Sequence, residues 1–240
     1  MKYMKEAIVK WIQDWFKENG PDCKAVIGIS GGKDSSIVAA LCVEALGKDR
    51  VLGVMMPNGT QDEDAYKVAE HLGIDYMIVS IESSYQGIIR NMQKNHIEIS
   101  KQTLINLPPR LRMSTLYAVS QSVNGRVANT CNFSEAYIGW ETRWGDAVGD
   151  FAPLQGLTCS EVIALGRELD LPKEFIEKVP SDGLCGSIDE DAFGFSYDEL
   201  DRWIRLGVKG EHHSEIICKH NKNRFKRLNL PYYSPPLVVY

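Results

Sequence analysis

The stretch Ala25-Val-Ile-Gly-Ile-Ser-Gly-Gly-Lys-Asp-Ser-Ser36 decides the fold class of this chain. Its first five residues predict a short buried strand, and residues 37–46 predict a helix that ends at Gly47. The small residues between them let the backbone approach a ligand closely, and the first N–H groups of the helix favour an anion. We therefore expect a phosphate or pyrophosphate to bind this strand–loop–helix unit.

The side chains of the loop agree with that expectation. Lys33 supplies a positive charge, and hydroxyl donors come from Ser30, Ser35 and Ser36. A P-loop would need Gly at position 27 and Ser or Thr at position 34, where this chain has Ile27 and Asp34. The dinucleotide fingerprint G-x-G-x-x-G also fails, because Ser30 replaces its second Gly. A tight turn without a ligand is the alternative, but such a turn needs only one or two of these residues.

Outward from this unit, strands and helices alternate. Further strands are predicted over residues 50–55, 74–80 and 126–130. Helices are predicted over residues 3–19, 62–72, 84–95, 102–123 (interrupted at Pro108-Pro109), 133–140, 160–169 and most of 197–227. Residues 180–196 contain several glycines and acidic residues and predict a mobile loop or lid. The alternation predicts an α/β fold with a doubly wound parallel sheet, whose ligand site lies at the carboxyl ends of the strands after Ile29 and Ala128.

The composition of the chain excludes several classes of protein. The 27 Lys and Arg against 32 Asp and Glu give a net charge of −5, so no nucleic-acid partner is expected, and only a local basic site stays open. A membrane partner is not expected either. No apolar run approaches the roughly 20 residues that cross a bilayer, and the N-terminus lacks a signal-peptide core. The six cysteines are scattered without a C-x-x-C pair, which favours reduced thiols in a cytoplasmic protein.

The pattern S-G-G-x-D-S at positions 30–35 resembles the pyrophosphatase loop (PP-loop) of the ATP pyrophosphatase superfamily. This resemblance implies a Rossmann-like fold of the adenine nucleotide alpha-hydrolase type. Members of the superfamily cleave ATP between the α- and β-phosphates and transfer AMP to a substrate oxygen. The motif does not specify the substrate, because GMP synthetase, asparagine synthetase and tRNA-modifying enzymes share it.

A second set of motifs resembles NAD synthetase. Residues 106–117 are similar to N-x-x-x-R-x-R-M-x-x-L-Y, residues 129–135 to G-T-x-x-x-x-E, and residues 141–150 to the T-K-Y-G-D-x-x-x-D stretch that precedes Pro-Leu. Residues 189–201 are similar to D-E-x-x-L-G-x-x-Y-x-x-I/L-D, and Lys226-Arg227 to the end of H-K-R. The resemblance runs from about residue 5 to residue 231, so we expect one NAD synthetase domain over residues 1–240.

The resemblance implies an ATP-dependent ligase that amidates deamido-NAD with ammonia through an acyl-adenylate and releases AMP and pyrophosphate. It also implies Mg²⁺ and a homodimer, and we expect the helix carrying residues 111–123 at the interface. Glutamine-dependent relatives carry an amidase domain ahead of the synthetase part. Because the PP-loop begins here at Gly28, after a single helix, we expect free ammonia rather than glutamine as the nitrogen donor.

The resemblance also implies roles for individual residues. Asp34 and Glu135 would act in catalysis and bind Mg²⁺. ATP would contact Gly28, Ile29, Ser30, Gly31, Gly32, Lys33, Asp34, Ser35, Thr130 and Ser181. Deamido-NAD would contact Arg110, Arg143, Asp150 and Lys226. Attack of a carboxylate on a triphosphate brings two anions together, so metal and cationic groups must carry much of the catalysis.

Each role has a simpler alternative. Arg110 could lie on a solvated helix face, and Asp150 could cap a loop. Asp34 could be a helix N-cap, and Glu135 a first-turn acid favoured by the helix dipole.

Four positions depart from the family pattern. Arg143 stands for Lys, Phe225 for His and Asn129 for Gly, and Cys159 stands where the family has Lys after P-L-x-x-L-T. One phosphate-binding cation is therefore missing at position 159, and a neighbouring residue would have to replace it. Two other functions stay open: a tRNA-modifying enzyme that adenylates a base oxygen, and a binding protein that kept the fold and lost turnover.

Overall fold

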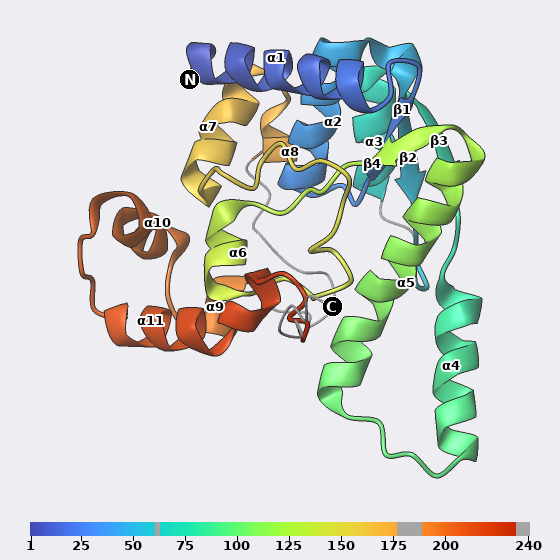
Figure 1. Cartoon of the computed structure of the whole chain (residues 1–240), viewed down its shortest axis with the longest axis vertical. Coiled ribbons are helices and arrows are strands. Elements are labelled where there is room, and N and C mark those ends of the chain that lie inside the picture. The colour runs from blue at the N-terminus through green and yellow to red at the C-terminus, as the bar shows by residue number, and fades with distance from the viewer. Residues whose placement is uncertain (61–62, 177–188, 234–240) are drawn as a thin grey trace, which may run out of the picture.

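The computed structural model describes residues 1–60, 63–176 and 189–233 (Figure 1). Within them, four parallel strands form one sheet in the order β3-β2-β1-β4, comprising β1 (Lys24–Gly28), β2 (Val51–Met55), β3 (Asp75–Ile78) and β4 (Gly125–Val127). The helices are α1 (Lys2–Asn19), α2 (Lys33–Leu46), α3 (Glu63–Leu72), α4 (Glu82–Lys94), α5 (Lys101–Ser122), α6 (Phe133–Ile138), α7 (Cys159–Glu168), α8 (Lys173–Ile176), α9 (Asp189–Phe193), α10 (Tyr197–Leu206) and α11 (His213–Lys222), with short 3-10 turns η1 (Lys48–Arg50) and η2 (Arg224–Arg227). The predicted parallel α/β sheet is confirmed.

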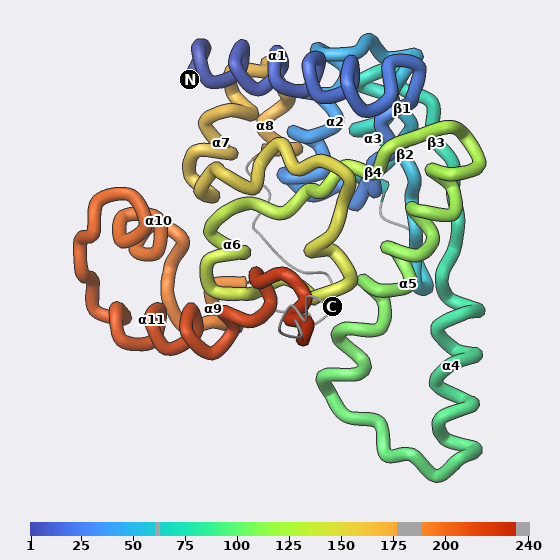
Figure 2. Tube along the Cα trace, viewed as in Figure 1, coloured from blue at the N-terminus to red at the C-terminus, as the bar shows by residue number. Residues whose placement is uncertain are grey.

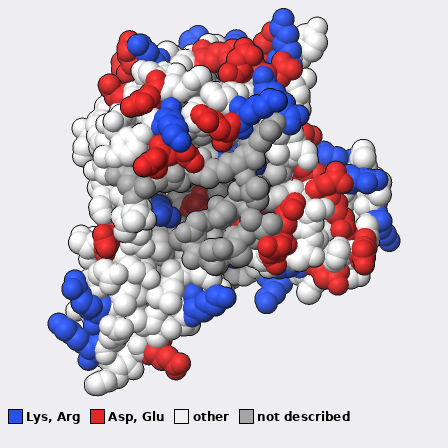
Figure 3. All heavy atoms as spheres, turned by 180° about the vertical axis from the view of Figure 1, so that it is seen from behind, with Lys and Arg blue, Asp and Glu red and all other residues white. Residues whose placement is uncertain are grey.

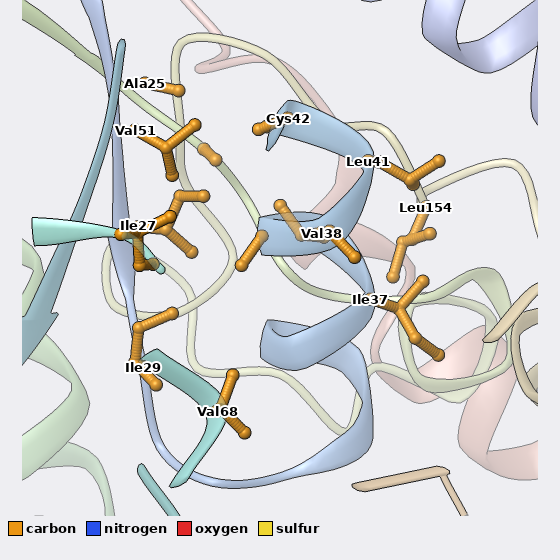
Figure 4. Close-up of a cluster of buried hydrophobic side chains, with 14 of the residues drawn as sticks. Ala25, Ile27, Ile29, Ile37, Val38, Leu41, Cys42, Val51, Val68 and Leu154 are labelled. Atoms are coloured by element: carbon orange, nitrogen blue, oxygen red, sulfur yellow. The ribbon is translucent and has the colours of Figure 1, made fainter. Parts of the chain in front are cut away.

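Alternate side chains of the strands face two separate cores. Ala25 and Ile27 of β1 belong to a large core with side chains of α1, α2 and α7 (Figure 4). Val26 faces the opposite side, where Leu52 and Val54 of β2 and four apolar residues of the α5 region (Leu111, Leu116, Val119, Val123) pack. Because successive strand residues point to opposite faces, this run of apolar residues requires helices on both sides of the sheet. The sheet is therefore doubly wound, as predicted.

The long helix α5 differs from its prediction. We expected an interruption at Pro108-Pro109, but both prolines lie inside one continuous helix and are buried. A proline inside a helix removes a backbone donor and crowds the preceding turn. Pro109 packs closely against the chain at Gly145, where an added Cβ would lie 3.0 Å from the Pro109 Cβ. Tertiary packing of the two prolines thus outweighs their poor helix propensity.

The prediction of a mobile loop or lid over residues 180–196 is wrong for the second half of that range. Residues 189–193 form helix α9, and Phe193, Phe195 and Tyr197 are buried against one another. Residues 180–188, with Ser181, lie outside the described residues. The other elements agree with their predictions within a few residues at each end.

The order of the strands positions the site. β1 is paired with β2 on one side and with β4 on the other, so the direction of the strand order changes between β1 and β4. Ligands of open α/β sheets bind at such a switch point, beyond the carboxyl ends of the strands. The loop before α2 and the loop before α6 both leave the sheet there, as the sequence predicted.

Two further features concern the outside of the molecule. Helix α4 and the adjoining part of α5 pack together and project beyond the sheet (Figure 2). In the described part of the chain, no helix combines the length and apolar character needed to cross a membrane. The five cysteines in that part are free thiols.

Candidate active site

The PP-loop is held by its own hydroxyl groups. Ser35 Oγ donates to the Gly32 carbonyl at 3.0 Å, and Ser36 Oγ donates to the same carbonyl at 2.8 Å. Gly31 has a φ of +75°, and a Cβ there would lie 2.9 Å from atoms of Asp64 and Ala65 on α3. The loop therefore needs glycine at position 31, both for its backbone conformation and for its close contact with α3.

Asp34 lies in the first turn of α2 and is not its N-cap. The N-cap is Gly32, and no side chain caps the helix. Asp34 Oδ2 instead accepts from Lys33 Nζ at 2.7 Å, and Lys33 is only 4% exposed. Asp34 Oδ1 is buried and has no hydrogen-bond partner among the residues that the structure describes. The N-cap alternative therefore fails, and one carboxylate oxygen is available for a ligand.

Glu135 lies at the corresponding position of the neighbouring loop, in the first turn of α6. Its backbone N–H donates to Asn132 Oδ1 at 3.1 Å, and its Oε2 accepts from Asn132 N at 3.3 Å, which forms a capping box. Burial, followed by the negative charge of Asp34, raises the pKa of Glu135, while Lys33 opposes the shift. The two carboxylates are about 100 residues apart in sequence, and the charge of Asp34 still acts on Glu135. Thr130 lies half-buried between the end of β4 and α6.

These two carboxylates fit a magnesium ion. A buried oxygen without a partner on Asp34 and the repulsion between Asp34 and Glu135 are both relieved by a cation between them. Mg²⁺ in nucleotide sites takes one or two carboxylates and completes its shell with phosphate oxygens and water. Among the described residues, no group of three or more His, Cys, Asp or Glu side chains could hold a metal ion.

Helices α7, α9 and α10 supply groups for which the sequence predicted no role. Tyr197 OH donates to Asp189 Oδ2 at 3.1 Å, and Lys33 Nζ lies 5.8 Å from the centre of the Tyr197 ring. Cys159, the first residue of α7, is buried beside the same groups. Asp189 and Tyr197 are the first and ninth residues of the matched motif over residues 189–201, and that motif was the available signal. On the face seen from behind in Figure 3, acidic atoms lie near the middle of the molecule, close to a basic side chain.

Three of the residues predicted to bind deamido-NAD gather from distant parts of the chain. Arg110 on α5 donates to the Arg143 carbonyl at 3.5 Å. The Arg143 guanidinium lies 4.9 Å from the Trp144 ring centre and 5.6 Å from that of Phe225. Lys226 in η2 donates to the carbonyls of Gly139 at 2.7 Å and Glu141 at 2.9 Å. The rings of Trp144 and Phe225 thus both lie close to the Arg143 guanidinium.

The fourth residue, Asp150, is not brought to these three. Its Oδ2 accepts from Val127 N at 2.7 Å and its Oδ1 from Tyr117 OH at 3.4 Å, so it fixes the end of β4. The alternative of a capping carboxylate therefore describes Asp150 in this structure. Asn129, in place of the family glycine, also has a structural role, because its side-chain amide donates to the carbonyls of Asp146 and Val148.

The alternative of a solvated helix face describes one of the two arginines of α5 but not the other. Arg110 is exposed and fits that description. Arg112 is half-buried and donates through Nε to the Met56 carbonyl at 3.2 Å, just beyond the end of β2. Burial lowers the pKa of Arg112. Arg112 therefore attaches α5 to the carboxyl edge of the sheet.

Comparison with known proteins agrees with this geometry. The model of the NAD synthase family matches residues 4–230. The NH(3)-dependent NAD(+) synthetase of Finegoldia magna is 39% identical over 233 residues, 95% of each chain, and that of Methanocaldococcus jannaschii is 40% identical over 224 residues, 90% of this chain and 86% of the relative.

Among solved structures, the NMN synthetase of Francisella tularensis has a TM-score of 0.87 at 33% identity over 98% of both chains. The NH3-dependent NAD synthetase of Campylobacter jejuni has a TM-score of 0.79 at 28% identity, covering 97% of this chain and 98% of that one. The strand order, the PP-loop at the switch point and the match over residues 4–230 lead to one conclusion: the chain belongs to the NAD synthase family.

Proposed function

We propose that this chain is a ligase that amidates deamido-NAD with ammonia and ATP. The observation that carries the proposal is the meeting of Lys33, Asp34 and Glu135 at the switch point of the sheet, in a chain 36–40% identical to proteins named NH(3)-dependent NAD(+) synthetase. We further propose that residues 1–240 act as one synthetase unit, and that the protein is cytoplasmic.

The reaction has two steps. An oxygen of the nicotinate carboxylate forms a bond to the α-phosphorus of ATP, and the bond from that phosphorus to the oxygen bridging to the β-phosphate breaks, with pyrophosphate leaving. Ammonia then forms a bond to the acyl carbon and loses a proton, and the C–O bond to AMP breaks. Both leaving groups are anions, so positive charge and N–H donors near the phosphates lower the barrier.

The chain places such groups around its PP-loop. The N-terminus of α2, with its dipole and N–H groups, adjoins the loop. Lys33 adds a buried positive charge. Asp34 and Glu135 would hold Mg²⁺, which when bound would neutralise phosphate charge and orient the triphosphate. We assign the remaining ATP contacts to Gly28–Ser35, Thr130 and Ser181.

For deamido-NAD we propose the cluster of Arg110, Arg143 and Lys226. The Arg143 guanidinium lies close to the rings of Trp144 and Phe225 and, among the described residues, uses one N–H group, which donates to the Leu228 carbonyl at 3.3 Å. Its other N–H groups can bind a phosphate with two parallel hydrogen bonds. Asp150 also belongs to the sequence-based proposal, although its hydrogen bonds support only the capping role.

A second candidate substrate follows from the Francisella tularensis protein. That protein is an NMN synthetase and is similar over 98% of both chains. The acid form of the mononucleotide contains the same nicotinate carboxylate and lacks the adenylate half of deamido-NAD. The same site chemistry therefore serves either acid, and only the contacts with the second nucleotide differ.

We also propose a homodimer. The sequence analysis placed the interface on residues 111–123 because of their apolar side chains. In the structure these side chains pack against the sheet, so they no longer support an interface there (Leu111, Leu116, Val119 and Val123). Exposed apolar side chains instead lie on β3, on α4, in the connection from α4 to α5 and at the start of α5, namely Tyr76, Ile78, Ile88, Ile97 and Leu104. Light scattering at micromolar concentration gives the mass that tests this; a fully active monomer contradicts it.

One assay tests the activity itself. The purified chain is incubated with ATP, Mg²⁺ and ammonium, and with deamido-NAD, nicotinate mononucleotide or bulk tRNA. Pyrophosphate and the amidated product are then quantified by chromatography. We expect pyrophosphate and NAD in equal amounts with deamido-NAD. Product only from the mononucleotide supports the second candidate, and pyrophosphate release only with tRNA contradicts both.

A further inference from the structure

Two acidic side chains, Glu141 and Asp146, are buried in the loop that follows α6. Glu141 is 4% exposed, and the negative charge of Asp146 acts on it. Asp146 is held in place, because its Oδ1 accepts from Thr142 N at 2.8 Å. The Oε2 atom of Glu141 is buried and accepts a hydrogen bond from none of the described residues. The pair therefore combines one fixed carboxylate with a second one whose buried oxygen lacks a donor in the described part of the chain.

The neighbouring cations do not supply that donor. Lys226 Nζ donates to the backbone carbonyls of Gly139 at 2.7 Å and Glu141 at 2.9 Å. Arg227 donates to the His220 carbonyl at 3.2 Å. The positive charges of Lys226 and Arg227 act on the Glu141 carboxylate through space. Burying a charge is costly unless it is paired and hydrogen-bonded, so a small N–H donor would supply what this carboxylate lacks.

The acid pair lies near the carboxylates proposed to bind Mg²⁺. Cys131 is in the loop between β4 and α6, and its Sγ lies 3.3 Å from the Asp146 carbonyl oxygen. Four carboxylates act electrostatically on this buried thiol, those of Asp146, Glu135, Glu141 and Asp34. One thiol within electrostatic reach of both pairs places them around the same part of the site.

The acid pair also adjoins the cluster proposed for deamido-NAD. Lys226 of that cluster donates to the Glu141 carbonyl, and Arg143 follows Glu141 by two residues. The charges of both acids and of Arg110 act on the Lys226 ammonium. An acyl-adenylate with its adenylate at the PP-loop and its nicotinate half at this cluster would therefore bring its acyl carbon toward the acid pair.

The chemistry of the second step requires acidic groups at such a place. Ammonia is about the size of a water molecule, and its N–H groups donate to carboxylates. When its nitrogen forms the bond to the acyl carbon, the nitrogen becomes positive and must lose a proton. Negative charge fixed beside the nitrogen stabilises this developing charge. A carboxylate with an unused oxygen can also take the proton.

We propose that Glu141, with Asp146 beside it, binds the ammonia and acts as general base in the amide-forming step. Glu141 Oε2 accepts an N–H of the ammonia and takes that proton as the C–N bond forms. The C–O bond to AMP then breaks, its electron pair leaves on the AMP oxygen, and Glu141 returns the proton to water. This inference rests on the proposed function and assigns a binding site to its nitrogen donor.

The titration of Glu141 suits this role. Burial, followed by the charge of Asp146, raises the pKa of Glu141 to about 7, against the effect of Lys226 and Arg227. A general base works best when its pKa lies near the working pH, because it is then ionised in many molecules and still binds a proton well. Burial raises the pKa of the Cys131 thiol, which therefore stays neutral in this range.

Two variants and a control test the role of Glu141. E141Q has the shape of a protonated glutamate and cannot take a proton, and E141D keeps a carboxylate on a shorter side chain. E70Q makes the same change at an exposed position on α3 and is the matched control. Each protein is checked by thermal unfolding.

The two steps of the reaction are measured separately. Exchange of labelled pyrophosphate into ATP, with deamido-NAD and without ammonium, reports the adenylation step. Amide formation in a single turnover after ammonium is added reports the second step. We expect the ratio of the amide rate to the exchange rate to fall about 100-fold in E141Q. E141D should retain more of this ratio than E141Q, and E70Q should keep the wild-type ratio.

A pH profile provides a second readout. The amide rate of the wild-type protein is divided by the concentration of uncharged ammonia, which removes the titration of the substrate itself. With a pKa of about 7, the ionised fraction of Glu141 rises about tenfold from pH 6 to pH 8, and the corrected rate should rise with it. The corrected rate of E141Q should not change over this range.

Three results would overturn the assignment. The first is a folded E141Q whose rate ratio and pH profile match those of E70Q. The second is an equal loss of exchange and amide formation in E141Q, because Glu141 would then act before ammonia does. The third, which needs no variant to fold, is a corrected wild-type rate that stays constant from pH 6 to pH 8. Failure of the proposed function is distinguishable, because the wild-type chain would then show no exchange with either nicotinate acid.

Discussion

Replacing Glu141 by Gln should stabilise the protein at neutral and alkaline pH. Glu141 is 4% exposed, and its Oε2 is buried with no hydrogen-bond partner in the described part of the chain. Burial, followed by the negative charge of Asp146, raises the pKa of Glu141 from 4.5 to about 7, against the opposing effect of Lys226 and Arg227. The carboxyl group therefore holds its proton more tightly in the folded protein than in the unfolded chain.

The sign and size of this effect on the free energy of unfolding follow from the linkage between proton binding and folding. Between pH 4.5 and 7 the folded protein binds more protons at Glu141 than the unfolded chain does, so the free energy of unfolding falls as pH rises. The two pKa values differ by about 2.5, and each pKa unit corresponds to about 1.4 kcal/mol, which gives about 3 kcal/mol in total. Glutamine has the same shape as a protonated glutamate and does not titrate, so Glu141→Gln removes this loss.

The assay is urea unfolding of wild type and Glu141→Gln at pH 5, 6, 7 and 8. The stability gain of the variant should be about 2.5 kcal/mol larger at pH 8 than at pH 5. Glu70→Gln, at an exposed position on α3, controls for the substitution itself and should show a difference that does not depend on pH. A gain for Glu141→Gln that stays constant from pH 5 to pH 8 would refute the reasoning.

Three further outcomes are expected. Asp34→Asn should fold normally and lose adenylation, with part of the rate restored by excess Mg²⁺; wild-type turnover in a folded variant would contradict the metal role. Ser134→Ala should lower the free energy of urea unfolding by about 1–3 kcal/mol, because Ser134 Oγ donates to Asp201 and accepts from Cys159 N at 3.0 Å. Wild-type NAD formation should require ammonium; formation from glutamine in ammonia-free buffer would exclude the predicted nitrogen source.

The sequence predicted the parts of the site that depend on neighbouring residues. The strand, the small residues of the PP-loop and the helix after it lie within about 20 residues, and the structure has them in that order. The carboxyl edge of the sheet was predictable as well, since parallel strands begin and end together. For this reason Asp34 and Glu135, far apart in the chain, were expected near one another and are found there.

Predictions failed where a residue's partner comes from a distant segment. The prolines of α5 pack into the structure instead of ending the helix, and Phe193 and Phe195 bury a stretch predicted to be a mobile loop. For Asp150 the structure shows hydrogen bonds from Val127 N and Tyr117 OH, whereas its contact with deamido-NAD stays a prediction. A motif records that a residue type is needed, and it does not distinguish a contact with substrate from a contact with backbone.

By itself, the sequence determined the fold class, the family and the place of the phosphate site, because strand and helix periodicity and the glycines of the PP-loop are local properties of the chain. The tertiary structure alone decided what each charge faces. Only in the fold does the Lys33 ammonium lie 5.8 Å from the centre of the Tyr197 ring, and only there does the Arg143 guanidinium lie close to the rings of Trp144 and Phe225. Burial and electrostatic partners depend on which distant segments pack together, and no short stretch of sequence contains that information.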